Sequence, residues 1–139
     1  MIVLDTSFVL ALLDDGDSEH IRAAKWYAGV GDLFATTPLV LAELDYLLHS
    51  RAAPAATHAF YEQIRRGSLG VEWWPGLENE ASEVAGRYAE VGLGLVDASL
   101  VVLAARLETV RIASFDERHF RAVEPLAGAD SFELLPADA

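Results

Sequence analysis

Four acidic side chains, spread over the chain, could together hold a divalent metal ion: Asp5, Glu43, Asp97 and Asp116. Mg²⁺ and Mn²⁺ prefer oxygen ligands, and Mg²⁺ keeps several waters in addition. One or two such ions can align a phosphodiester, activate a water and stabilise the leaving oxygen. This chemistry requires neither histidine nor cysteine. Because the acids are far apart in sequence, the fold must bring them together from different elements.

Glu43 is the acid whose sequence surroundings are most unusual. Its neighbours on a predicted helix are apolar, and no basic residue lies three or four positions away. A buried carboxylate without a partner is unstable, so Glu43 needs a cation, a metal ion or a proton. Asp45 on the same helix could be the acid that faces solvent. The alternative is that Glu43 lies at the edge of the apolar stripe.

Short apolar runs that alternate with helical patterns would position these acids. The runs predict strands over 2–5, 33–36, 71–74, 110–115 and 131–135. Helices are predicted over 8–13, 18–28, 38–50, 54–66, 77–91 and 97–108. This alternation favours a parallel sheet covered by helices on both faces, and ligands of such sheets bind at the carboxyl ends of strands. Asp5 and Asp116 each follow a predicted strand.

Helix starts give some of these polar residues a second interpretation. Thr6 and Ser7 can cap the helix that follows them, and Thr37 can cap the helix that starts with Pro38. Asp97 could likewise be the N-cap of its helix, and Asp116 a turn residue. For these two acids the sequence alone leaves both interpretations open.

Length and composition predict one domain over residues 1–139. The chain has no cysteine, which excludes disulfides and thiolate metal sites. It has no apolar run that could span a bilayer and no signal peptide at Met1, so we expect a soluble cytoplasmic protein.

The formal net charge of −12 is unusual for a protein that binds nucleic acid, because contacts to phosphates usually come from basic residues. Bound metal ions and a local arginine patch could reverse the field. The candidates for phosphate contacts are Arg51, Arg65, Arg66, Arg118 and Arg121, which could equally be solvated surface residues. We expect the four histidines, His119 among them, to lie on the surface or to have hydrogen-bond partners.

In order and spacing, the acidic motifs resemble those of PIN-domain proteins, and most of all the VapC-like toxins of bacterial toxin–antitoxin pairs. The similarity covers essentially the whole chain. It rests on Asp5–Ser7, on Glu43 within Leu41–Leu44, on Asp97 within Val96–Leu100, and on Ser114–Phe120.

This resemblance implies an α/β/α sandwich around a parallel, roughly five-stranded sheet, commonly ordered 3-2-1-4-5. It also implies a Mg²⁺- or Mn²⁺-dependent endoribonuclease that is usually a homodimer and is inhibited by a small VapB-like antitoxin. The resemblance also implies that Asp5, Glu43, Asp97 and Asp116 hold the metal ion and its attacking water. Ser7 and Ser114 match supporting hydroxyls, although the family often has threonine where this chain has Ser114. Its RNA substrate could be tRNA or rRNA.

Four other functions use a similar fold or a similar set of acids. A phosphatase of the haloacid dehalogenase type needs a second acid at the position of Ser7. A response-regulator receiver needs a lysine late in the chain, whereas the only lysine is Lys25. A catalytically silent PIN-like binding module and a metal-dependent DNase remain as alternatives. Sequence does not separate RNA from DNA, because recognition of the 2′-hydroxyl depends on geometry.

Overall fold

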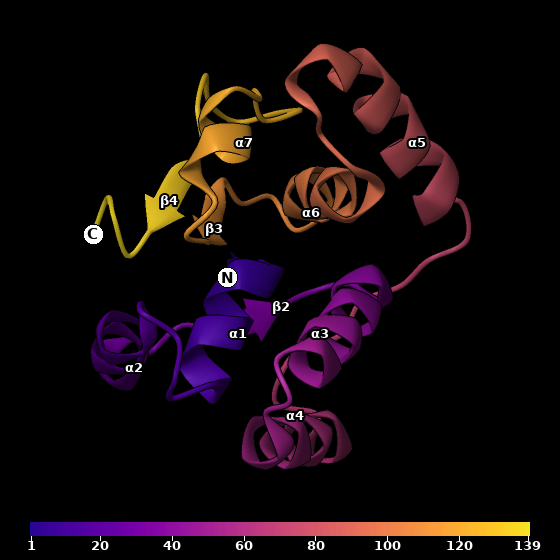
Figure 1. Cartoon of the computed structure of the whole chain (residues 1–139). Helices are drawn as coiled ribbons and strands as arrows, with labels where there is room; N and C mark the ends of the chain where they lie inside the picture. The colour runs from indigo at the N-terminus through magenta and orange to yellow at the C-terminus, as the bar shows by residue number, and fades with distance from the viewer.

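A computed structural model describes all 139 residues, in which short strands alternate with helices (Figure 1). The strands are β1 (Ile2–Leu4), β2 (Phe34–Ala35), β3 (Arg111–Ala113) and β4 (Glu133–Leu135). The helices are α1 (Thr6–Leu13), α2 (His20–Gly29), α3 (Pro38–Ser50), α4 (Pro54–Arg66), α5 (Leu77–Arg87), α6 (Leu95–Arg106) and α7 (Glu117–Arg121), with a 3₁₀ turn, η1 (Ala89–Val91).

All strand pairs are parallel, and the sheet order is β2-β1-β3-β4. In Figure 1, α5 and α6 lie on one side of the strands, and α1 and α2 on the other. This arrangement confirms the predicted α/β class with a parallel sheet between helices. The central strand β1 pairs with both β2 and β3, and Val3 lies opposite Ala35 of β2 and Ile112 of β3.

The predicted strand over 71–74 is wrong, so the sheet has four strands rather than about five. A single bridge between Thr36 and Val71 remains of it, beside β2. The expected order 3-2-1-4-5 is therefore present with its third strand reduced to this bridge. Residues 71–74 do not form a strand because Val71 and Trp73 are exposed at the sheet edge and Pro75 cannot donate a ladder hydrogen bond.

Gly70 brings the chain to this bridge. Its φ of +62° lies in the left-handed region, and a Cβ at this position would collide with the backbone carbonyl of Phe34. The close approach lets the Thr36 amide donate to the Gly70 carbonyl at 3.1 Å. Glycine is thus required where the chain passes the edge of β2.

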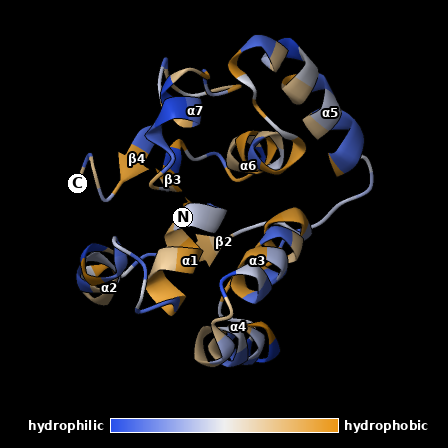
Figure 2. Cartoon of the chain, in the orientation of Figure 1, coloured by the Kyte–Doolittle hydropathy of each residue, from blue (hydrophilic) through white to orange (hydrophobic).

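The core forms because the strands are apolar on both faces. All three residues of β1 are buried, as expected for a strand covered by helices on both sides. Helix α6 is buried from Ala98 to Ala104 and packs against β1 and α5. Figure 2 shows the apolar colour concentrated in α1, α6 and the strands, whereas α7 is hydrophilic.

Several helix boundaries differ from the predictions. Helix α1 begins at Thr6, not at residue 8, because Asp5 is its N-cap and accepts a hydrogen bond from the Ser7 amide. Helix α6 begins at Leu95, so Asp97 lies in its first turn instead of capping it. The predicted helix over 77–91 ends at Arg87 and is followed by η1. Helix α7 was not predicted. None of the helices has the length and apolar character of a membrane span.

Candidate active site

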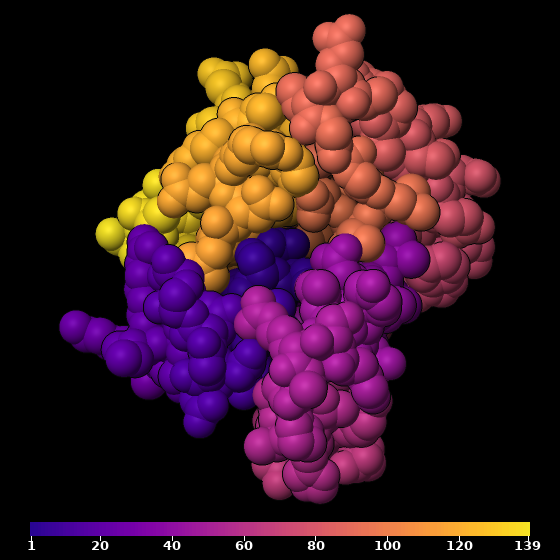
Figure 3. Space-filling model, in the orientation of Figure 1, coloured from indigo at the N-terminus to yellow at the C-terminus, as the bar shows by residue number.

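The predicted acids line one pocket of about 550 Å³ at the carboxyl ends of β1 and β3. Asp5 follows β1 and Asp116 follows β3, whereas Asp97 comes from α6 and Glu43 from α3. Figure 3 shows a hollow at the centre of this face, where residues of the N-terminal segment are recessed between α3, α6 and α7. Segments more than 100 residues apart therefore meet, as parallel strands with helical crossovers require.

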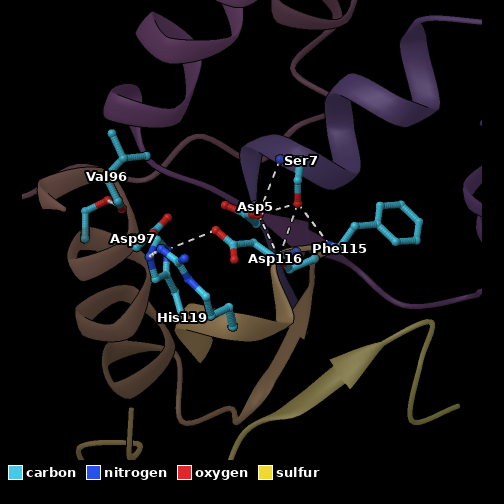
Figure 4. A network of polar contacts seen from close by, with 10 residues as sticks. Asp5, Ser7, Val96, Asp97, Phe115, Asp116 and His119 are labelled. Atoms are coloured by element: carbon cyan, nitrogen blue, oxygen red, sulfur yellow. Dashed lines mark hydrogen bonds and ion pairs between the residues drawn. The ribbon is translucent and has the colours of Figure 1, made fainter. Parts of the chain in front are cut away.

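Asp5 is 3% exposed, and two serines fix its carboxylate. Its Oδ2 accepts hydrogen bonds from the Ser7 hydroxyl at 2.6 Å and from the Ser114 hydroxyl at 2.7 Å. Figure 4 shows this network between the end of β1 and the end of β3. Burial raises the pKa of Asp5 above its ordinary value, and the two serine hydrogen bonds partly oppose that shift. Because both serines bond Oδ2, they leave Oδ1 without a side-chain partner.

Each serine also accepts a backbone hydrogen bond. The Phe115 amide donates to Ser7 Oγ at 2.9 Å, and the Asp116 amide donates to Ser114 Oγ at 2.9 Å. Each hydroxyl has one hydrogen, which it donates to Asp5, so the 3.3 Å contact between the two Oγ atoms is not a further bond. The serines therefore join the start of α1 to the turn that carries Asp116.

Asp97, Asp116 and His119 form the tightest group in the pocket. One potential ligand atom from each lies within 4.8 Å of the others. His119 Nδ1 is 3.0 Å from Asp97 Oδ2 and 3.0 Å from Asp116 Oδ2 (Figure 4). The pKa of Asp97 is raised to about 6, first by burial and then by the charges of Asp5 and Asp116, with His119 acting in the opposite direction. Concentrated negative charge thus costs folding free energy unless a cation is bound.

Glu43 lies in the second turn of α3 and lines the same pocket, half-buried, with Leu47 one turn further on. It is outside the group of three and forms no ion pair. A buried bond between Thr37 Oγ1 and Ser99 Oγ, 2.9 Å long, connects the start of α3 to the start of α6. Thr37 is the N-cap of α3 and Pro38 follows it, as predicted, but the Thr37 side chain makes no capping hydrogen bond. It instead links the helices that carry Glu43 and Asp97.

His119 belongs to the site, although the sequence did not indicate it. Its spacing could have done so, because a histidine three residues after Asp116 lies on the same face of the helix once α7 forms. The five-residue helix was too short to be recognised from periodicity.

The donor set fits a hard divalent cation. The carboxylates supply oxygen ligands, and one imidazole lies beside them, as Mg²⁺ or Mn²⁺ sites allow. None of the four acids pairs with arginine or lysine, although many other acids of the chain do. An added cation would relieve the repulsion that raises the pKa of Asp97.

Comparison with known proteins identifies the family. Residues 2–125 match the PIN domain. The chain is 32% identical over 136 residues to Ribonuclease VapC26 of Mycobacterium tuberculosis, covering 97% of this chain and 100% of that protein. The crystal structure of M. tuberculosis VapC20, a Sarcin-Ricin loop cleaving toxin, superposes on this chain with a TM-score of 0.76 at 29% identity. The match covers 84% of this chain and 91% of VapC20. These matches, together with the acidic pocket at the edge of a parallel sheet, show that the chain belongs to the PIN-domain family.

Proposed function

We propose that this chain is a metal-dependent endoribonuclease and the toxin of a type II toxin–antitoxin pair. It hydrolyses RNA phosphodiester bonds at the pocket lined by Asp5, Glu43, Asp97 and Asp116. The relatives named as a ribonuclease and as an RNA-cleaving toxin support this function. The observation that carries the proposal is the convergence of these acids on one open pocket from four separate elements.

The acids of the pocket differ in how the protein holds them. Asp5 is fixed by Ser7 and Ser114, so its free Oδ1 does not have to reorient when a ligand arrives. Asp97 and Asp116 add oxygens to the same pocket. A bound Mg²⁺ or Mn²⁺ would polarise the phosphodiester and lower the pKa of a water. Those three acids would hold the ion.

Glu43 lines the same pocket from α3 and has no ion-pair partner. It is suited to accept a proton or hydrogen bond from the water that attacks phosphorus, as the P–O bond on the far side breaks. His119 holds Asp97 and Asp116 close together through Nδ1. In this arrangement the protein supplies orientation, and the ion supplies the positive charge that phosphoryl chemistry needs.

Purified protein with bacterial ribosomal RNA and transfer RNA tests the enzymatic part. We expect cleavage with Mn²⁺ or Mg²⁺, none in EDTA, and recovery when the ion is restored. Asp5→Asn should lose activity while remaining folded, whereas Asp130→Asn, which removes the same charge from an exposed loop, should retain it. Activity in chelator, or a fully active Asp5→Asn variant, would contradict the proposal. Single-stranded DNA in parallel reactions tests the DNase alternative, and no cleavage of any substrate would favour the silent module.

The toxin role adds a partner. A small VapB-like antitoxin should bind this chain and block cleavage, and the chain alone should arrest bacterial growth in the cytoplasm, where its RNA substrates lie. Glu43→Ala should relieve the arrest, and a Glu43→Ala protein that stays toxic would show that the harm is not catalytic. The homodimer implied by the family is checked by light scattering of the purified chain.

A further inference from the structure

The basic residues differ sharply in whether a carboxylate already neutralises them. Four of the five arginines predicted as candidates for phosphate contacts form ion pairs. Arg51 binds Asp14 and Asp17, Arg65 and Arg66 share Glu62, and Arg121 binds Glu117 and Asp138. A guanidinium held by carboxylates would have to give up those bonds before it could bind a phosphate.

Arg118 is the exception. It lies on α7, two residues after Asp116, is exposed, and has no carboxylate within ion-pair distance. Its only side-chain contact is NH2 with His119 Nε2 at 3.3 Å. His119 lines the acidic pocket, so Arg118 lies at the rim of that pocket. Most of its five N–H donors remain free.

Other cations near the site are less available. Arg22 lies over the ring of Phe115, 5.5 Å from its centroid, but pairs with Glu19 at 3.6 Å. Arg106, which also lacks a carboxylate, stacks on Trp74 at 4.3 Å. Arg87 has no ion pair either, but it lies on α5, which contributes no residue to the pocket. Arg118 is therefore the one unpaired cation in contact with a residue of the pocket.

We propose that Arg118 is a substrate-binding residue that contacts a backbone phosphate of the RNA next to the cleaved bond. This inference rests on the proposed function. The RNA must bind to a protein of net charge −12. The RNA phosphates next to the cleaved bond need a cation, which the four acids cannot provide. A guanidinium can bind a phosphate through two parallel hydrogen bonds. Because it recognises the backbone, the contact is independent of base sequence.

The geometry also explains how Arg118 is held ready. Its NH2 donates to His119 Nε2, and the other ring nitrogen, Nδ1, lies 3.0 Å from Asp97 Oδ2. The guanidinium is thereby kept beside a residue of the pocket by a single 3.3 Å hydrogen bond that a phosphate can replace. A carboxylate partner would compete with RNA, whereas an imidazole nitrogen is a weaker competitor.

The experiment measures anisotropy of fluorescein-labelled poly(U) with the full chain in Mn²⁺, between about 50 and 200 mM salt. Arg118→Gln should weaken binding roughly tenfold to a hundredfold. It should also reduce the slope of log affinity against log salt by about 0.7, the value for one contact to a single strand. Arg118→Lys should keep the slope, and Arg87→Gln, which removes an unpaired cation from α5, should bind like the wild type.

Two further measurements separate this role from a structural one. Mn²⁺ affinity, by calorimetry, and the melting temperature should both be unchanged in Arg118→Gln. Wild-type poly(U) affinity and slope in Arg118→Gln would overturn the inference, as would weakened Mn²⁺ binding, which would mean that Arg118 acts through His119. A wild-type chain that does not bind poly(U) would overturn it too. The proposed function is tested separately by ribosomal RNA cleavage, so the two can fail independently.

Discussion

Asp97→Asn should make the metal-free protein more stable while removing its activity. The pKa of Asp97 is raised from 3.8 to about 6, because the folded protein buries this carboxylate beside Asp5 and Asp116. Folding therefore disfavours the charged form. An asparagine has nearly the same shape and can still accept a hydrogen bond from His119, but it removes the charge. The variant isolates the electrostatic cost of the site.

The magnitude follows from linkage between protonation and folding. A shift from 3.8 to about 6, at about 1.4 kcal/mol per pKa unit, corresponds to roughly 3 kcal/mol as an upper value. Because Asp97 is coupled to its neighbours, we expect about 1–3 kcal/mol, or about 3–10 °C in melting temperature. The folded state binds the proton more tightly than the unfolded state, so wild-type stability falls as pH rises from about 4 to about 6. The extra stability of Asp97→Asn over the wild type should therefore increase between about pH 4 and about pH 6 and stay constant at higher pH.

Chemical denaturation in EDTA at a series of pH values measures this difference, with Asp130→Asn as the control for the loss of one exposed negative charge. Saturating Mn²⁺ should reverse the order, because only the wild type gains stability from the ion, about 4.1 kcal/mol at one thousand times the dissociation constant. Equal or lower stability of Asp97→Asn above pH 6 in EDTA would refute the reasoning. It would mean that the contact between His119 and the Asp97 carboxylate outweighs burial and repulsion.

Two further predictions concern the same pocket. The Mn²⁺ affinity of the wild type, measured by calorimetry, should weaken by up to about tenfold for each pH unit below about 6, because Asp97 must lose its proton to bind the ion. An affinity that does not change down to pH 5 would exclude Asp97 as a ligand. Ser114→Ala removes a buried hydrogen bond to Asp5 and an acceptor for the Asp116 amide, so it should cost about 2–3 kcal/mol of stability and reduce cleavage. The exposed Ser82→Ala is its control, and a Ser114→Ala protein with wild-type melting and cleavage would contradict the supporting role.

The fold could be predicted largely because its strands are buried and short. The run Ile2–Leu4, for example, has no polar residue and is followed by a helical pattern. The same reasoning failed for residues 71–74, where an apolar run lies exposed at the sheet edge. Apolar composition indicates a strand only where a neighbouring strand and covering helices are available.

The site was only partly predictable for a related reason. Asp5 and Asp116 follow strands, so their meeting at one edge of a parallel sheet could be expected from topology. His119 and the bond between Thr37 and Ser99 depend on contacts between helices that no local pattern encodes. Local rules placed Thr37 correctly at the N-cap of α3, but they could not show that its hydroxyl bonds Ser99 of α6.

The acids of this strongly negative chain differ in whether they pair with arginine. Acids such as Asp14, Asp17 and Asp138 hold arginines in surface ion pairs. None of the pocket acids does so, and Asp97 and Asp116 share only a histidine. If structural stability alone determined these positions, pairing or neutral residues would be preferred, because buried like charges are destabilising. An acidic cluster free of arginine and lysine fits a cation from outside the chain. In the proposed function, that cation would allow an acidic protein to bind RNA.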